Sequence, residues 1–177
     1  MRNYNFGLKL RSPIPAQDTS IEDLITQLRF NETVVKMPQT HKTFDVNFKV
    51  EAETEIGAKG LSQLVINKID EIEQCPDLTF EVMAVNGVLL STDQASLFFC
   101  IDLLEIVDSE ARVLAKPDFP TLHEDGFQEP MWDSYELSQW LFERGYITSH
   151  FVNKALAIKT ANHVLECRRL KSLKLSA

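Results

Sequence analysis

The stretch Asp93–Val107, DQASLFFCIDLLEIV, is the one around which the rest of the chain is predicted to fold. Ten of its fifteen residues are apolar, and on a helical wheel they leave only a narrow polar wedge formed by Gln94, Asp102 and Glu105. Ser91 and Gln94 have the S-x-x-Q spacing of a capping box, which predicts where the helix begins. We therefore predict one helix covered by a sheet on one face and by other helices or a second subunit elsewhere. The alternative is a buried strand over LFFCI.

Length and composition indicate an ordinary globular protein. The chain has 177 residues, 44% of them apolar and 25% charged, with few Gly and Pro, which suits one sizeable core. The first fifteen residues lack the apolar centre of a signal peptide, and no window approaches the length of a membrane span. We therefore expect no membrane insertion and a cytoplasmic protein in which Cys75, Cys100 and Cys167 are reduced thiols.

The formal net charge of −8 is distributed unevenly. Residues 1–50 carry seven Lys/Arg and five Asp/Glu, residues 51–147 carry five and twenty, and residues 148–177 carry six and one. A footprint on phosphate needs clustered Lys/Arg, so the acidic middle is not predicted to bind nucleic acid. It suits a cationic partner or serves solubility.

Alternation of apolar and polar residues predicts the strands. Asn3–Arg11 and Phe44–Ala52 alternate clearly, and we predict the second as the central strand. Thr33–Met37 is predicted as a further short strand. Leu78–Leu90 is predicted as a hairpin around Asn86-Gly87, the pair that best tolerates the positive φ angles of a type I′ turn. Because the strands have one polar face, that side of the sheet meets water or a partner.

Helical periodicity predicts the remaining elements at Ile21–Leu28, Gly60–Glu73, Met131–Arg144 and from Phe151 onward. The order of strands and helices predicts an α+β protein, a two-layer domain with an antiparallel or mixed sheet of about 4–6 strands packed by helices. We divide it into an α+β core over 1–115, an acidic loop over 116–130, and a C-terminal helical segment over 131–177 packed on the same domain.

The loop and the helix after it predict a binding surface. The loop KPDFPTLHEDGFQEP has no periodicity, and structureless loops of this length are often functional. Aromatic residues on the next helix spread too widely to face one sheet, and such anchors beside acidic groups suit a basic or amphipathic partner. The predicted partner-binding residues are Phe119, His123, Glu124, Asp125, Phe127, Trp132 and Tyr135. We therefore predict a non-enzymatic protein-binding module, an adaptor, inhibitor or chaperone-like protein, that forms a homodimer.

A nucleic-acid-binding protein is the first alternative. The segment Leu137–Ile158, with a turn near Gly145, is loosely similar to a helix-turn-helix. Basic residues follow it on the last helix and its tail, namely Lys154, Arg168, Arg169, Lys171 and Lys174. On the wheel these cations scatter, whereas a recognition helix needs one cationic face.

A hydrolase with a carboxylate/His site is the second alternative. Glu51, Glu53 and Glu55 are predicted to project from one face of a strand, and His123 stands beside two carboxylates. The sequence contains no G-x-x-x-x-G-K-[ST], no G-x-G-x-x-G and no close Cys/His pair. We therefore predict no catalytic residues, no cofactor and no metal.

Three segments carry a family resemblance. They are Phe44–Thr54, the turn-containing Phe80–Leu90, and Phe119-Pro120-Thr121-Leu122 followed by Phe127. Over about a third of the chain these segments resemble acidic bacterial export chaperones of the SecB type, and the resemblance implies a chaperone-like role. The helix at Gly60–Glu73 and the long helical C-terminus depart from that family's pattern.

Overall fold

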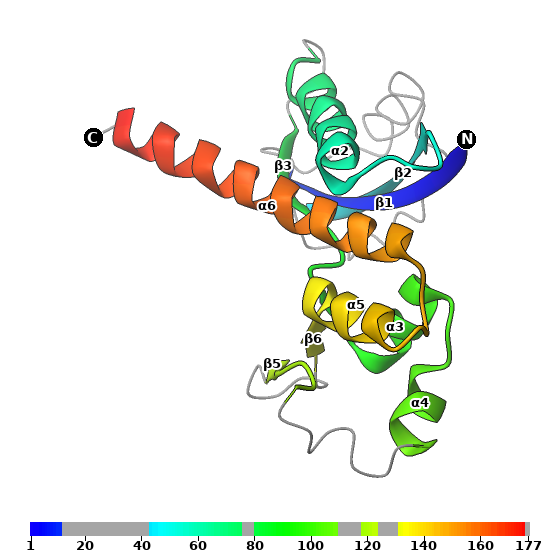
Figure 1. The fold of residues 1–177 in the computed structure, drawn as a ribbon. Helices are drawn as coiled ribbons and strands as arrows, with labels where there is room; N and C mark the ends of the chain where they lie inside the picture. Colours follow the sequence, from blue (N-terminus) through cyan, green and yellow to red (C-terminus); the bar gives the residue numbers. More distant parts are fainter. Residues whose placement is uncertain (12–42, 76–79, 110–117, 124–130, 176–177) are drawn as a thin grey trace. The chain divides into compact units, whose positions relative to one another are not determined.

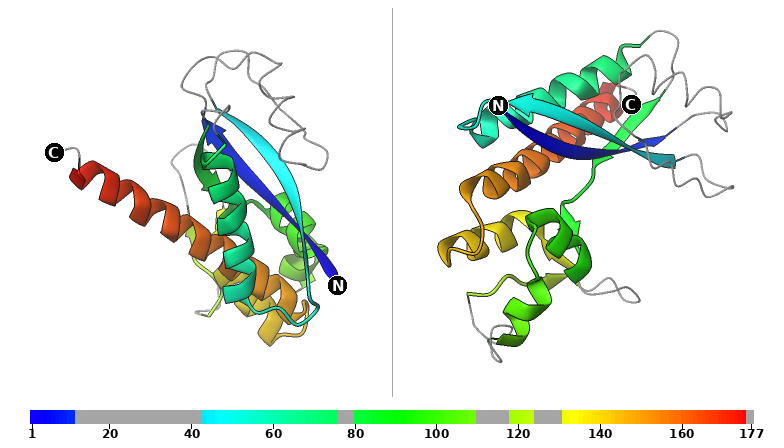
Figure 2. Two further views of the ribbon diagram at one scale, coloured as in Figure 1. Left: turned by 90° about the horizontal axis from the view of Figure 1, so that it is seen from above. Right: turned by 90° about the vertical axis from the view of Figure 1, so that its right-hand side faces the viewer.

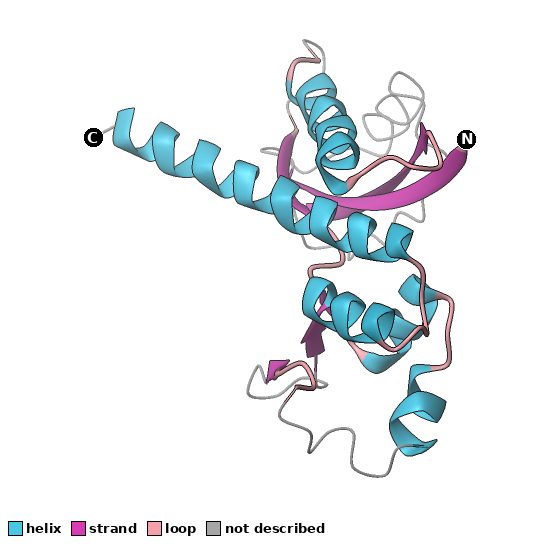
Figure 3. Cartoon of the chain, viewed as in Figure 1, coloured by secondary structure: helices cyan, strands magenta, loops and turns pink. Residues whose placement is uncertain are grey.

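The computed structural model describes residues 1–11, 43–75, 80–109, 118–123 and 131–175 (Figure 1). The chain divides into two compact units: unit 1 is residues 1–86 with 157–177, and unit 2 is residues 87–156. Among the described residues each unit contains a three-stranded antiparallel sheet and helices, which confirms the α+β class, with fewer described strands per sheet than expected (Figure 3). The predicted helix Ile21–Leu28 and strand Thr33–Met37 lie outside the described residues. The predicted division near residues 115 and 130 stays a prediction.

The sheet of unit 1 consists of β1 (Arg2–Arg11), β2 (Thr43–Ala52) and β3 (Glu81–Val85), in the order β2-β1-β3. β1 pairs with β2 along its whole length and with β3 through its last residues. The prediction that Phe44–Ala52 is the central strand is therefore wrong for the three described strands. Alternation of apolar and polar residues shows that a strand has one solvent-exposed face, but it does not distinguish a middle strand from an edge strand.

The inner face of this sheet forms the core of unit 1. Alternate residues of β1 and β2 are buried, as the sequence predicted: Tyr4, Phe6, Leu8, Leu10, Phe44, Val46 and Phe48. The predicted helix Gly60–Glu73 is confirmed as α2 (Ala58–Glu73), whose buried row is Leu61, Val65, Ile69 and Ile72. The long helix α6 (Ser149–Leu175) adds Ala157, Ile158, Ala161 and Leu165. Unit 1 is thus a sheet with one apolar face, held by two helices.

Polar side chains of α6 hold the exposed edge of β3. The side chain of Asn162 accepts a hydrogen bond from the Val85 amide at 3.0 Å and donates one to the Val85 carbonyl at 2.9 Å. Arg169 donates to the carbonyls of Val82 and Met83. These bonds satisfy backbone groups that an edge strand otherwise leaves open to another chain.

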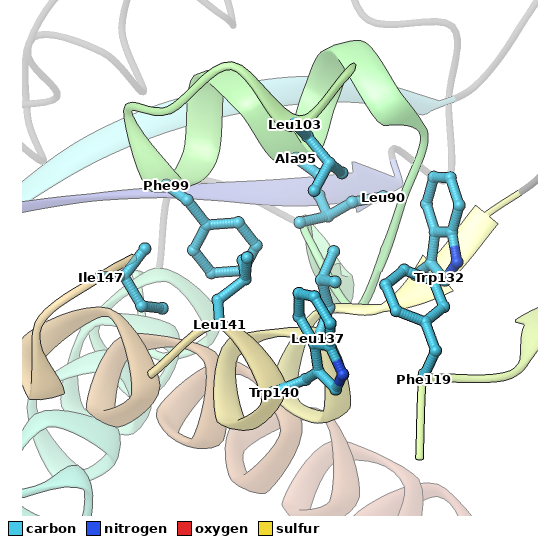
Figure 4. Close-up of a cluster of buried hydrophobic side chains, with 10 residues drawn as sticks. All are labelled: Leu90, Ala95, Phe99, Leu103, Phe119, Trp132, Leu137, Trp140, Leu141 and Ile147. Carbon is cyan, nitrogen blue, oxygen red and sulfur yellow. The ribbon is translucent and has the colours of Figure 1, made fainter. Parts of the chain in front are cut away.

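Unit 2 has its own small sheet, in the order β4-β6-β5. Its elements are β4 (Leu89–Leu90), α3 (Thr92–Phe99), α4 (Leu103–Ser109), β5 (Leu122–His123), β6 (Met131–Asp133), α5 (Ser134–Glu143) and the first turns of α6. Figure 4 shows its core, made by Leu90, Ala95, Phe99, Leu103, Phe119, Trp132, Leu137, Trp140, Leu141 and Ile147. Further apolar residues pack against this cluster, among them Phe98 and Phe151.

The predicted hairpin over Leu78–Leu90 is wrong, because β3 pairs with β1 whereas β4 pairs with β6. A type I′ turn needs positive φ at both central residues. Gly87 has φ 96°, but Cys100 is the one non-glycine residue with positive φ in the described part of the chain. Asn86 is instead held in unit 1, where its amide donates to the Gly7 carbonyl at 2.8 Å and its side chain donates to Asp45 at 2.9 Å.

The predicted helix Met131–Arg144 also begins later than expected. Its first three residues form β6, and Trp132 pairs there with Leu90 on one side and Leu122 on the other. Asp133 ends the strand and caps α5, because its carboxylate accepts hydrogen bonds from the amides of Tyr135 and Glu136 at 2.9 and 3.0 Å. Aspartate is among the preferred N-cap residues, so the cap was a signal that the sequence contained.

Candidate protein-binding surface

The apolar run Asp93–Val107 forms two helices and not the single helix predicted. The predicted capping box is confirmed: the Gln94 amide donates to the Ser91 hydroxyl at 3.4 Å, and the Ser91 amide donates to the Gln94 side chain at 3.1 Å. α3 then ends at Phe99, since Cys100 adopts the left-handed conformation with φ 55° and ψ 44°. A residue in this conformation closes a helix C-terminus.

Four hydrogen bonds fix the turn between the two helices. The amides of Cys100 and Ile101 both donate to the Ser96 carbonyl. The Ser96 hydroxyl accepts from the Leu103 amide at 3.1 Å, and the Asp102 carboxylate accepts from the Glu105 amide at 3.0 Å. α3 and α4 are therefore a helix-turn-helix with a three-residue turn. Sequence reasoning missed it because glycine, the usual residue at such a turn, is absent.

The turn separates the apolar residues of the run into a buried set and an exposed set. Ala95, Phe99 and Leu103 are at most 1% exposed, whereas Leu97 is 81% exposed and Leu104 is 53% exposed. The described residues of one chain do not cover the run on every side, so the predicted cover by a second subunit stays a prediction. The sequence prediction placed the whole run on one continuous helical wheel. Because the helix is interrupted at Cys100, that wheel does not describe which residues of α4 are buried.

Three acidic residues that are close in sequence to the two exposed leucines are exposed as well. Asp93, Asp102 and Glu105 are all exposed, and with Leu97 and Leu104 they make up what we call the α3–α4 surface. Unit 2 as a whole contains twelve Asp/Glu and four Lys/Arg, a formal net charge of −8, while unit 1 contains fourteen of each. The entire net charge of the chain therefore falls on the unit that exposes these leucines.

Two of the predicted partner-binding residues belong to the core. Phe119 is 9% exposed and Trp132 is 5% exposed. Their rings pack edge to face, with 6.4 Å between the ring centroids (Figure 4). Phe119 also contacts the Trp140 ring at 4.9 Å. Tyr135 is half-buried and His123 is exposed on β5, while Glu124, Asp125 and Phe127 lie outside the described residues. Of the four described residues of this set, two are therefore buried, and the predicted site as a whole stays a prediction.

Three of the five predicted nucleic-acid-binding residues make contacts within their own unit. The Lys154 ammonium lies 4.1 Å from the centre of the Phe98 ring, and burial lowers the pKa of Lys154 to about 8. Arg168 forms an ion pair with Asp70 at 2.6 Å, and this hydrogen bond raises the Arg168 pKa. Arg169 holds the edge of β3. The last two, Lys171 and Lys174, are exposed.

The carboxylates of the hydrolase alternative do not share a strand. β2 ends at Ala52, so Glu53 and Glu55 lie in the turn after it, where the Ile56 amide donates to the Glu53 carbonyl at 3.1 Å. The prediction of three carboxylates on one strand face is therefore wrong. In the described ranges no group of three or more His, Cys, Asp or Glu residues could hold a metal ion.

Two further properties bear on the setting of the protein. None of the three described cysteines, Cys75, Cys100 and Cys167, forms a disulfide. No helix among the described residues is long and apolar enough to cross a membrane.

Comparison with known proteins gives no match to a family model, a curated protein or a solved structure. The likeness to SecB-type chaperones stays an expectation from the sequence.

Proposed function

We propose that this chain is a non-enzymatic protein-binding module that binds a basic or amphipathic segment on its α3–α4 surface. The observation that carries the proposal is the exposure of Leu97 and Leu104 on two consecutive helices, flanked by carboxylates, in a unit of net charge −8. Leucine side chains in a partner's apolar face would bury there, and cationic residues at its margin would meet Asp93, Asp102 and Glu105. A cytoplasmic setting is part of the proposal, and three cysteines without a disulfide are in keeping with it.

The same helix-turn-helix is poorly suited to nucleic acid. In DNA-binding proteins the second helix of the motif lies in the major groove. Here that helix is α4, whose exposed residues include Leu104 and Glu105. A carboxylate at this place repels phosphate, and the affinity of such proteins depends on cations near the backbone. The charge of unit 2 therefore favours a protein partner.

Replacing both exposed leucines by serine tests the proposal. We expect Leu97→Ser/Leu104→Ser to weaken binding of a basic amphipathic helical peptide at least about tenfold, since it removes both exposed apolar side chains of the surface. Fluorescence anisotropy of a labelled peptide measures the affinity, and quantitative mass spectrometry of proteins captured from the host shows whether natural partners follow the same pattern.

A matched control is Phe142→Ser, because Phe142 is also in unit 2 and 46% exposed, but lies on α5. We expect this variant to bind like the unaltered protein, and all variants to keep their melting temperature. Equal binding by the leucine variant and the unaltered protein would contradict the proposal. So would a salt-dependent shift of labelled DNA or RNA that Lys171→Glu/Lys174→Glu abolishes.

A further inference from the structure

The C-terminal end of α6 is an exposed helix with two large apolar side chains. The five consecutive residues from Leu170 to Lys174 are all exposed, Leu170 by 53% and Leu173 by 66%. In Figure 1 and in the left view of Figure 2 the last turns of this helix run on past α2 and β3 of unit 1.

The exposed residues of this end form one stripe. On a helical wheel Leu173, Leu170, Lys174 and Lys171 follow one another within an arc of about 160°. Arg168 and Arg169 point to the other side, where Arg168 binds Asp70 and Glu73 of α2 and Arg169 binds the carbonyls of β3. The stripe is therefore held facing away from unit 1. We call Leu170, Lys171, Leu173 and Lys174 the α6 stripe.

The α6 stripe and the α3–α4 surface are complementary in composition. One presents two leucines with two lysines, and the other presents two leucines with three carboxylates. Contact between them would bury exposed leucines on both sides and pair opposite charges at the margin. Because every copy of the chain has both surfaces, a second copy supplies the basic amphipathic segment at the same concentration as the site.

Resting on the proposed function, we infer that the α3–α4 surface of one copy binds the α6 stripe of a second copy. The two surfaces differ, so the contact is heterologous. It closes into a dimer if both copies use both surfaces on each other, and extends into a chain of copies if they do not. Either form gives self-association that depends on charge.

Reciprocal charge reversal tests this inference on the full chain. One variant is Lys171→Glu/Lys174→Glu, which makes the stripe acidic. The other is Asp93→Lys/Glu105→Lys, which makes the surface basic and leaves the capping residue Asp102 in place. We expect the unaltered protein to associate at micromolar concentration in sedimentation velocity. Each variant alone should associate at least about 100-fold more weakly, because like charges then face each other.

Mixing the two variants provides the decisive measurement. In the mixture the acidic stripe meets the basic surface and the basic stripe meets the acidic surface, so we expect association to return to near the unaltered level. Lys9→Glu/Lys49→Glu, on exposed residues of β1 and β2, is the matched charge control and should associate normally. A monomeric unaltered protein, association that survives in either variant, or a mixture that stays monomeric would overturn the inference.

Failure of this inference is distinguishable from failure of the proposed function. If the unaltered protein is monomeric but loses the amphipathic peptide on Leu97→Ser/Leu104→Ser, the surface binds other proteins and the self-contact is rejected. If neither peptide binding nor self-association responds to that variant, both proposals are rejected.

Discussion

The two units differ in the residues that they expose to solvent. In unit 1 the outer face of the sheet carries polar residues such as Asn5, Lys9 and Lys49, and the charges of the unit cancel. In unit 2 the exposed face of the helix-turn-helix carries Leu97 and Leu104 and lies in a unit of net charge −8. Solvation explains the first face completely. The second exposes apolar area that folding of the unit does not require, and the proposed binding function would account for it.

The largest difference between a buried and an exposed side chain occurs within the apolar run itself. We expect Phe99→Ala to lower the free energy of unfolding by about 3–5 kcal/mol, because Phe99 is 1% exposed and packs against Phe98 and Phe151. We expect Leu104→Ala to lower it by less than about 1 kcal/mol, since that side chain is 53% exposed. Urea denaturation of both variants measures the difference. Equal losses would show that Leu104 is buried and that the α3–α4 surface does not exist.

The sequence predicts those elements well in which every residue follows one period. β1, β2 and α2 were predicted with their buried residues because a two-residue or 3.6-residue repeat runs through each without interruption. The pairing of the strands was not predictable in this way, since β1 lies between two strands that are distant in sequence. Local patterns contain no information about which strands meet.

The α3–α4 surface was missed for a different physical reason. The break at Cys100 depends on hydrogen bonds that the side chains of Ser96 and Asp102 accept from the amides of Leu103 and Glu105, which compete with a continuous helix. Those residues are the only local signals, and a strongly apolar run hides them. The position of Trp132 was also predicted wrongly. The predicted helix included it, whereas it lies on β6, and α5 begins only after the capping residue Asp133.

A second prediction concerns the charge buried in unit 2. Burial lowers the pKa of Lys154 from 10.5 to about 8, while the nearby Cys100 acts in the opposite direction. The folded state therefore binds its proton less tightly than the unfolded state, so the protonated amine destabilises the fold at neutral pH. We expect Lys154→Met to raise the free energy of unfolding at pH 7 by roughly 1–3 kcal/mol, with the contact to the Phe98 ring reducing the gain.

The pH dependence of the free energy of unfolding tests whether the charge of Lys154 is responsible. Between pH 8 and 10.5 the unfolded chain holds the Lys154 proton that the folded chain has lost, so the stability contributed at this residue rises with pH. The advantage of Lys154→Met should consequently shrink across this window in denaturation measured at several pH values. Lys49→Met, at an exposed lysine, should follow the unaltered protein throughout. A constant advantage at every pH would mean that packing, and not the charge, is responsible.

The smallest expected effect is the difference in stability between two substitutions of Cys100. Its sign shows whether Asp93–Val107 forms two helices or one. Cys100 has φ 55°, a conformation that costs residues with a side chain about 1 kcal/mol more than glycine. We therefore expect Cys100→Gly to be more stable than Cys100→Ala by about 0.5–1 kcal/mol, with peptide binding unchanged because the turn and its leucines stay in place. In a continuous helix the order reverses, since glycine is about 1 kcal/mol worse than alanine in a helix interior. Chemical denaturation of the two variants measures the difference directly. If alanine is the more stable, the turn at Cys100 is rejected, and with it the exposed leucines on which the binding proposal depends.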